Sequence, residues 1–205
     1  MARWRTPQAW QTAAHKLKSN PSRFPGMEQD LFLVLACSYH NLPSDNIKSC
    51  FIYCSLFPKN HEIGRDQLEE LWIGEGFLDE FDHIREARNQ GDSIIARLQG
   101  AFLLRDGMSE KYVTMHDKIC DMALWIAHEG GRKKKFVVEK QVELIEADEV
   151  ATWKEAQRIS LWDCSVGELK ASPSFLNLET ILMVSYSNAT NPARETVKTK
   201  VFDIG

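Results

Sequence analysis

A histidine and an aspartate stand at the junction of two sequence patterns, where their side chains could do polar chemistry. In the stretch VTMHDKICDMALWIA, residues 113–127, a short β-branched run ends at His116-Asp117 and an apolar pattern of helical spacing begins at once. The first backbone N–H groups of a helix lack partners within the helix, so we expect Asp117 to cap it. Two interpretations are open for the pair: local capping, or a polar contact with a ligand or a neighbouring domain.

The cysteines could bind a metal or form disulfides, but their number and spacing favour neither. Cys50 and Cys54 are four residues apart and share one helix face, yet no second Cys/His pair at zinc-finger spacing completes a site, so we predict no metal site. An odd number without a CxxC motif indicates reduced, mostly buried thiols in a cytoplasmic protein. Ser55 has no His/Asp relay, so we do not interpret it as a nucleophile, and we predict no catalytic residue and no enzyme. The five cysteines are Cys37, Cys50, Cys54, Cys120 and Cys164.

The composition is that of a folded globular protein with one or two domains. The chain has 205 residues, of which 43% are hydrophobic and 26% charged, enough apolar material to bury a core. The net charge of −4 argues against a general nucleic-acid binder. The N-terminus lacks the apolar centre of a signal peptide, and the longest apolar run, Leu31 to Cys37, is too short to span a bilayer, so we expect no membrane span.

Two groups of elements precede and surround the His-Asp pair. Helices expected at 6–18 and 28–39 have little to bury against each other and look like half of a helical bundle. Two short apolar runs around Asp106-Gly107 predict a hairpin formed by 101–105 and 111–115. Three helices followed by a hairpin is the order of elements in a winged helix. The three helices are expected at 44–56, from 65 or 66 to 74, and at 83–99.

After the pair, the sequence predicts a helix, a linker and the start of a repeat. The helix is expected at 118–128 and is followed by a basic run at 132–135, which we interpret as part of a solvated linker. Arg158–Trp162 and Leu178–Leu182 are similar strand-like pieces. The separation of Leu161 and Leu182 falls within the leucine-rich repeat range, although two units are fewer than a stable array needs. The tail from Ser185 contains no recognisable repeat.

Three spaced blocks resemble those of one protein family. The blocks are CFIYCSLFP at 50–58, LWIGEGF at 71–77 and VTMHD at 113–117. In this order they look like the blocks of plant intracellular immune receptors, the coiled-coil class of NB-ARC leucine-rich repeat proteins. Met115-His116-Asp117 is similar to the MHD motif of that family, and the resemblance covers about residues 3–185.

The resemblance implies a mainly α fold with four parts. Residues 1–43 would be the C-terminal part of the NB-ARC helical subdomain, a partial helical bundle. Residues 44–130 would be the winged-helix subdomain with the MHD motif, and 131–155 a linker. Residues 156–205 would be the start of the α/β leucine-rich repeats and an irregular tail.

The resemblance also implies a regulatory function in plant defense. In the family, ADP holds the receptor in an off state, and exchange for ATP accompanies activation. Met115, His116 and Asp117 would be the nucleotide-sensing residues, with the histidine reaching the β-phosphate of ADP. A contact from an imidazole N–H to a phosphate oxygen is worth about 1.5–3 kcal/mol.

This chain departs from the family pattern at the phosphate-binding loop. It contains no G-x-x-x-x-G-K-[ST] motif and no Gly-Lys dipeptide, so the phosphate cradle, its lysine and the magnesium-binding hydroxyl are missing. We therefore expect no ATP hydrolysis, and no ADP or ATP retained by this chain alone. The expected partners are proteins, namely the missing nucleotide-binding domain and other receptor chains.

Two alternatives to a regulatory receptor fragment are an adaptor or decoy and a DNA-binding module. An adaptor without a P-loop would dock on full-length receptors through the surface that normally faces the missing domains. A winged helix could also bind DNA, but residues 41–130 contain 9 Lys and Arg against 16 Asp and Glu, a net charge of −7. Because phosphate recognition needs a basic surface, this balance argues against DNA as a partner.

Overall fold

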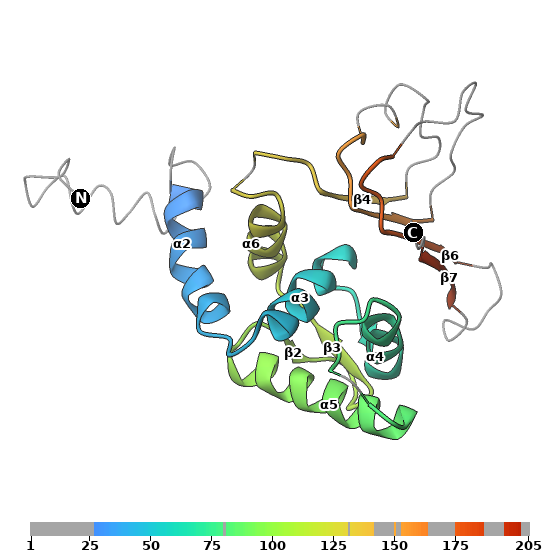
Figure 1. The fold of residues 1–205 in the computed structure, drawn as a ribbon. Coiled ribbons are helices and arrows are strands. Elements are labelled where there is room, and N and C mark those ends of the chain that lie inside the picture. Colours follow the sequence, from blue (N-terminus) through green and yellow to red (C-terminus); the bar gives the residue numbers. More distant parts are fainter. Residues whose placement is uncertain are drawn as a thin grey trace, which may run out of the picture.

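Five helices and two small sheets make up the part of the chain that the computed structural model describes. These residues are 27–79, 81–130, 132–141, 150, 153–163, 175–186 and 195–201. The helix predicted at 6–18 lies outside them. Figure 1 shows the helices grouped together, with the sheet of β4 to β7 on one side of them. None of the described helices is long and apolar enough to cross a membrane.

The middle of the chain forms the predicted arrangement of three helices and a hairpin. The sheet is antiparallel with the order β1-β3-β2, so β3 pairs with both other strands. The two-residue strand β1 was not predicted, and only the end of the first apolar run is a strand, because Leu103 and Leu104 turn into the core instead. The elements are α3 (Asp45–Tyr53), a 3-10 turn η2 (Cys54–Leu56), β1 (Ile63–Gly64), α4 (Arg65–Gly74), α5 (Ile84–Gly100), β2 (Arg105–Asp106) and β3 (Tyr112–Thr114).

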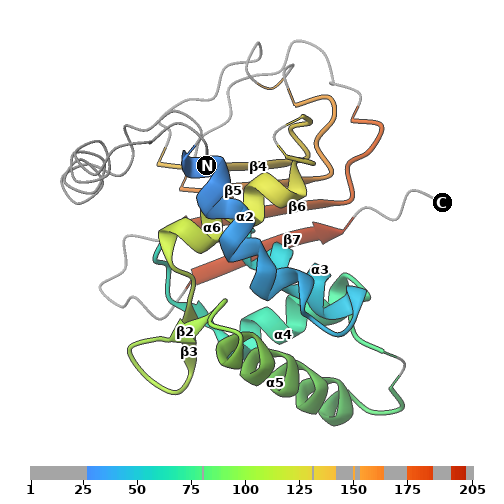
Figure 2. The ribbon, with the colours of Figure 1, turned by 90° about the vertical axis from the view of Figure 1, so that its left-hand side faces the viewer.

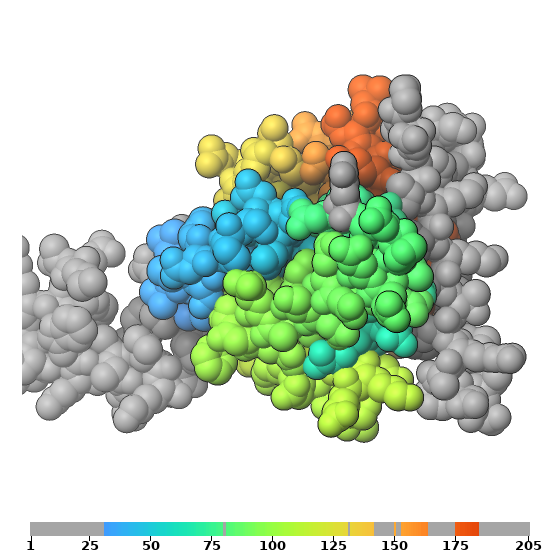
Figure 3. Space-filling model, turned by 60° about the horizontal axis from the view of Figure 1, so that its bottom comes forward, coloured from blue at the N-terminus to red at the C-terminus, as the bar shows by residue number. Residues whose placement is uncertain are grey.

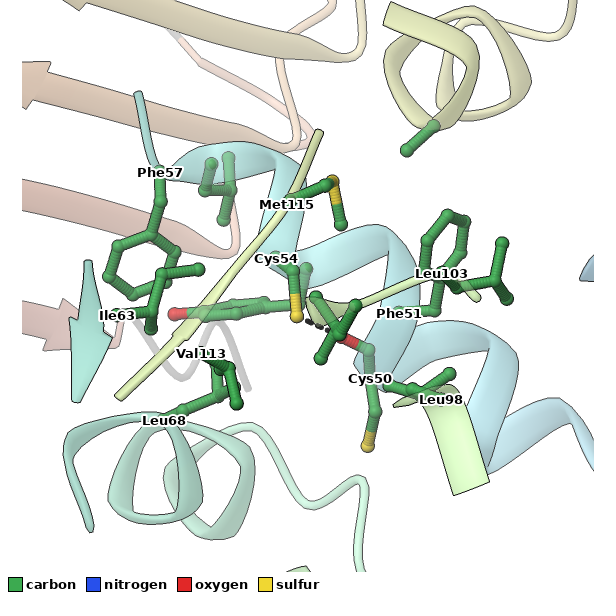
Figure 4. Close-up of a cluster of buried hydrophobic side chains, with 14 of the residues drawn as sticks. Cys50, Phe51, Cys54, Phe57, Ile63, Leu68, Leu98, Leu103, Val113 and Met115 are labelled. Carbon is green, nitrogen blue, oxygen red and sulfur yellow. Dashed lines mark hydrogen bonds between the residues drawn. The ribbon is translucent and has the colours of Figure 1, made fainter. Parts of the chain in front are cut away.

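The core of this unit is built around the first of the three blocks, CFIYCSLFP. The Ser44 hydroxyl caps α3 by accepting a hydrogen bond from the Ile47 N–H at 3.4 Å. Phe51 and Cys54 are buried among side chains from α4, α5 and β3, as the close-up in Figure 4 shows. Burial raises the pKa of Cys50 to about 12, so this thiol stays protonated at neutral pH. The cysteines were predicted to be mostly buried, and among the described residues Cys50, Cys54 and Cys120 are buried whereas Cys37 is exposed.

Two further helices pack beside this unit. Helix α2 (Met27–His40) lies against α6 (Asp117–Ala127), and the Phe32 and Trp125 rings are 6.0 Å apart between centroids. The two helices stand side by side in Figure 1, and in Figure 2 helix α2 crosses in front of α6. Leu33 and Val34 on α2 are 58% and 69% exposed, and Figure 3 shows part of this helix, in blue, at the surface. The predicted half-bundle is represented among the described residues by α2 alone.

The second sheet contains three parallel strands and one antiparallel strand, in the order β4-β5-β6-β7. The strands are β4 (Phe136–Lys140), β5 (Arg158–Trp162), β6 (Thr180–Tyr186) and β7 (Glu195–Val201). Phe136, Arg158 and Thr180 are neighbours across the first three strands, so the same distance in sequence separates β4 from β5 and β5 from β6.

This sheet differs from the sequence prediction in three respects. Strand β4 lies in the segment expected to be a linker, and β7 lies in the tail expected to be irregular. Leu161 pairs with Met183 rather than Leu182, so the repeat is one residue longer than the separation of the two leucines. The register of parallel strands depends on backbone pairing, so the separation of the two leucines predicted a repeat length that is one residue too short.

The two faces of the second sheet belong to different cores. Val137, Ile159 and Leu161 form a small cluster with side chains from the connecting segments. On the opposite face, Phe136 and Trp162 join the main core together with residues of the winged helix. The first three strands are therefore packed directly on the winged-helix unit.

A buried carboxyl lies between α4 and α5. Glu69 is 3% exposed, and a Cβ added at Gly91 would lie 2.5 Å from its Cγ, so α5 needs a glycine there. Burial, and then the neighbouring carboxylates of Asp92 and Asp66, raise the pKa of Glu69 to about 7. Glu69 therefore favours folding in its protonated form.

We expect Glu69→Gln to change how stability depends on pH. Since the folded-state pKa of Glu69 is raised, its contribution is present below about pH 4.5 and is lost as the pH rises through 7. The variant should gain roughly 2–4 °C in Tm relative to the wild type at pH 8, corresponding to about 1 kcal/mol, and nothing at pH 4. Thermal denaturation across this pH range measures the effect. Glu70→Gln, at an exposed neighbour, is the control, and an equal response of both variants would contradict the assignment.

Candidate functional site

His116 occupies the N-cap of α6, directly after β3. Its backbone is extended, with φ −64° and ψ 142°, and its Nδ1 accepts a hydrogen bond from the Lys118 N–H at 3.1 Å. The cap is therefore His116 and not Asp117, which is the first residue of the helix. The sequence prediction was wrong by one position because an imidazole nitrogen can fill the acceptor role usually taken by a short oxygen-bearing side chain.

The capping bond fixes the tautomer of the His116 ring. An Nδ1 atom that accepts a hydrogen bond carries no proton, so the proton of the neutral ring is on Nε2. The side chain is exposed. The site therefore presents one N–H donor at the surface, held in orientation by the start of the helix.

The three residues predicted to sense a nucleotide have different surroundings. Met115 is 4% exposed and belongs to the main core, so it anchors the segment and offers no contact to a ligand. Asp117 lies in the first turn, where a carboxylate interacts favourably with the helix dipole. Its Oδ1 is buried and has no hydrogen-bond partner in the described part of the chain. Of the three, His116 is the one with an exposed side chain.

The start of α6 is not an open phosphate cradle. The N–H groups of Ile119 and Cys120 both donate to the His116 carbonyl at 2.9 Å, and that of Lys118 donates to the imidazole. The nearby Asp121 forms ion pairs with Lys59 and, at 3.6 Å, with Lys118. Most donors here are thus engaged, and the arrangement fits a single hydrogen bond to a phosphate oxygen but not a complete nucleotide site.

Two surface pockets lie away from His116. One, of about 370 Å³, lies between α3 and the second sheet and is lined by aromatic and basic side chains that include Tyr39, Phe77 and Arg158. The other, of about 340 Å³, lies between α3 and α5. His116 lines neither of these two pockets.

An ion pair between the winged helix and the second sheet was not predicted from the sequence. Glu75 and Arg158 form an ion pair of 2.6 Å, with side-chain exposures of 4% and 13%. They are 83 residues apart, so no local pattern connects them. The available signal was one carboxylate within the otherwise apolar block LWIGEGF, where burial would demand a partner.

The comparisons with known proteins agree with the winged-helix geometry. Residues 56–123 match the winged helix domain of disease resistance proteins. Probable disease resistance protein At1g15890 from Arabidopsis thaliana is 39% identical over 184 residues, 89% of this chain and 22% of that protein. From the same organism, disease resistance protein SUMM2 is 38% identical over 185 residues, 89% of this chain and 21% of its own length, and disease resistance protein UNI is 36% identical over 179 residues, 87% and 20%. The chain spans about a fifth of these relatives, and it belongs to the plant disease resistance protein family.

Proposed function

We propose that this chain is a regulatory part of a plant NB-ARC leucine-rich repeat immune receptor, in which His116 senses the ADP-bound resting state. The proposal assigns it no catalytic role. The observation that carries it is the exposed Nε2–H of His116, whose ring is fixed by the capping bond to Lys118. Such a donor suits recognition of a phosphate group that another segment holds.

The proposed contact suits a regulatory role because its free energy is large enough to shift a two-state balance. ADP supplies phosphate oxygens as acceptors, and His116 would donate one charge-assisted hydrogen bond to the β-phosphate. A loss of about 2 kcal/mol from the closed state changes a two-state balance roughly thirtyfold. Asp117 would contribute indirectly, by favouring the first turn of α6 and hence the position of the histidine.

The second sheet is the proposed start of the leucine-rich repeats. Its three parallel strands recur at one constant step, from Phe136 to Arg158 to Thr180, and this step lies within the range typical of such repeats. Residues 1–43 would then belong to the helical subdomain, 44–130 to the winged helix and the strands from β4 onward to the repeats.

We expect His116→Ala to weaken ADP binding by roughly 10- to 150-fold, the equivalent of one charge-assisted hydrogen bond. The chain would be joined to the preceding nucleotide-binding segment of a relative such as SUMM2, and the affinity for ADP measured by calorimetry. His40→Ala, which removes an exposed histidine at the end of α2, is the matched control. Equal affinities of wild type and His116→Ala would exclude the proposed contact.

A second candidate function is that of an adaptor that docks on full-length receptors. It is favoured by the exposed Leu33 and Val34 on α2. In this case the chain would co-elute with the nucleotide-binding segment of a relative whether or not ADP is present. A Leu33→Ser, Val34→Ser variant would abolish co-elution, whereas His116→Ala would not affect it.

A further inference from the structure

The contact between the winged helix and the second sheet is centred on the Glu75 carboxylate, at the C-cap of α4. Its Oε2 accepts hydrogen bonds from Arg158 Nε at 3.1 Å and Nη2 at 2.6 Å, and its Oε1 accepts one from the Thr180 hydroxyl. Arg158 is in β5 and Thr180 is its direct neighbour in β6. One acceptor group on the winged helix therefore engages two adjacent strands.

The Arg158 guanidinium is held from several directions. It lies over the rings of Phe77 and Phe136, 5.5 and 5.7 Å from their centroids. Its Nη2 also lies 2.8 Å from Oε2 of Glu179, whose side chain is 52% exposed. Since the planar fork of arginine donates in fixed directions, these contacts define an orientation and not merely a proximity.

A second polar contact lies further along β5. The carbonyl of Leu56, at the end of η2, accepts hydrogen bonds from the Ser160 hydroxyl at 2.7 Å and from the Trp162 indole N–H at 3.2 Å. Arg158, Ser160 and Trp162 occupy alternate positions of the strand, so they lie on one face of it. The whole polar row of β5 thus faces the winged helix.

Apolar contacts alone would not determine which strand docks at this position. Phe136, Trp162 and Leu182 lie on the same face of three successive strands, and all are buried in the common core. Burial of apolar surface is non-directional, so a sheet displaced by one strand could bury a similar area. The buried Glu75 carboxylate opposes such a displacement of the sheet, because it would lose its hydrogen-bond partners on β5 and β6.

We propose that Glu75 is the positioning residue that determines where the second sheet docks on the winged helix. This role explains the carboxylate in the block LWIGEGF, which the proposed nucleotide contact leaves unused. It does not depend on whether His116 meets a phosphate, because the two sites share no residue.

The test uses the whole chain and the exchange of tryptophan indole protons followed by NMR. The Trp162 indole N–H donates to the Ser160 hydroxyl at 2.7 Å and to the Leu56 carbonyl at 3.2 Å, and it reports docking because the ring is fully buried only where β5 contacts the winged helix. Trp72, fully buried in the winged helix, reports the global stability of that unit. Trp162→Phe and Trp72→Phe assign the two signals. Glu75→Gln keeps the shape of the side chain but removes its charge. The double variant Glu75→Leu, Arg158→Met replaces the polar pair with apolar groups of similar size.

In both Glu75 variants we expect the exchange of Trp162 relative to Trp72 to accelerate by about tenfold or more. In Glu179→Gln, which changes only the exposed partner of Arg158, this ratio should stay within about twofold of wild type. An unchanged ratio in either Glu75 variant, whether both protons exchange faster or neither does, would overturn the proposal. It would mean that Glu75 affects stability alone or has no role in docking.

Discussion

Replacing Trp162 with alanine is expected to lower the free energy of unfolding by about 3–5 kcal/mol. The side chain is fully buried, its ring lies 4.7 Å from that of His61 and 5.5 Å from that of Phe57, and its N–H donates to the Leu56 carbonyl. The variant would leave a large cavity between the winged helix and the second sheet, and the Leu56 carbonyl would keep only the hydrogen bond from the Ser160 hydroxyl. Denaturation by urea, followed by circular dichroism, measures the loss.

Two further variants separate the causes of this effect. Trp162→Phe retains most of the ring but removes the donor, and should cost about 1–2 kcal/mol. Trp125→Ala alters a partly buried tryptophan on α6 and should cost less than Trp162→Ala. If Trp125→Ala and Trp162→Ala were equally destabilising, the contact between the winged helix and the second sheet would not contribute more to stability than the packing of α6.

The helices were predictable from the sequence because their signals are local. The caps and breakers at Ser44, Pro58 and Gly74 and the apolar spacing between them predict α3 and α4 within a few residues of their ends. The same holds for α5 and α6, whose apolar positions recur with a helical period. The winged helix followed from their order, and the match to that domain confirms it.

The short strands and the second sheet were less predictable because they depend on pairing between distant segments. Ile63 and Gly64 form a strand only because β3 lies beside them, and two residues carry no periodic signal. Strand β4 follows a basic run that indicated a solvated linker, yet it pairs along its full length with β5. Such pairing is decided by the tertiary structure.

The candidate site, like the fold, was predictable from the sequence only in part. The sequence placed His116 at the start of a helix, which the structure confirms, but it assigned the cap to Asp117 because carboxylates are the commoner caps. Its proposed contact with a nucleotide remains a prediction. The ion pair of Glu75 with Arg158 joins residues from two units and could be found only from the structure.

We expect acidification to destabilise the contact between the winged helix and the second sheet through His61. This ring stacks on Phe57 and lies in a tilted contact with Trp162. Burial, followed by the charge of Lys140, lowers the pKa of His61 to about 4. Because the folded state binds this proton more weakly than the unfolded state, the stabilisation from neutral His61 is complete above about pH 6.5 and is lost as the pH falls toward 4. After allowance for partial exposure, the loss should be about 1 kcal/mol or more.

The measurement must separate His61 from Glu69, whose raised pKa gives stability the opposite dependence on pH between about 4.5 and 6.5. The Glu69→Gln background removes that opposing contribution. In this background we expect His61→Phe, which can keep the ring stacking, to flatten the fall in unfolding free energy from pH 6.5 to 4, whereas His40→Phe at an exposed position should leave it unchanged. Because the slope is compared and not the absolute stability, any packing change caused by phenylalanine cancels. An equally steep slope with and without His61 would show that acid acts elsewhere in the chain, and that the histidine between the two units is not the group that titrates.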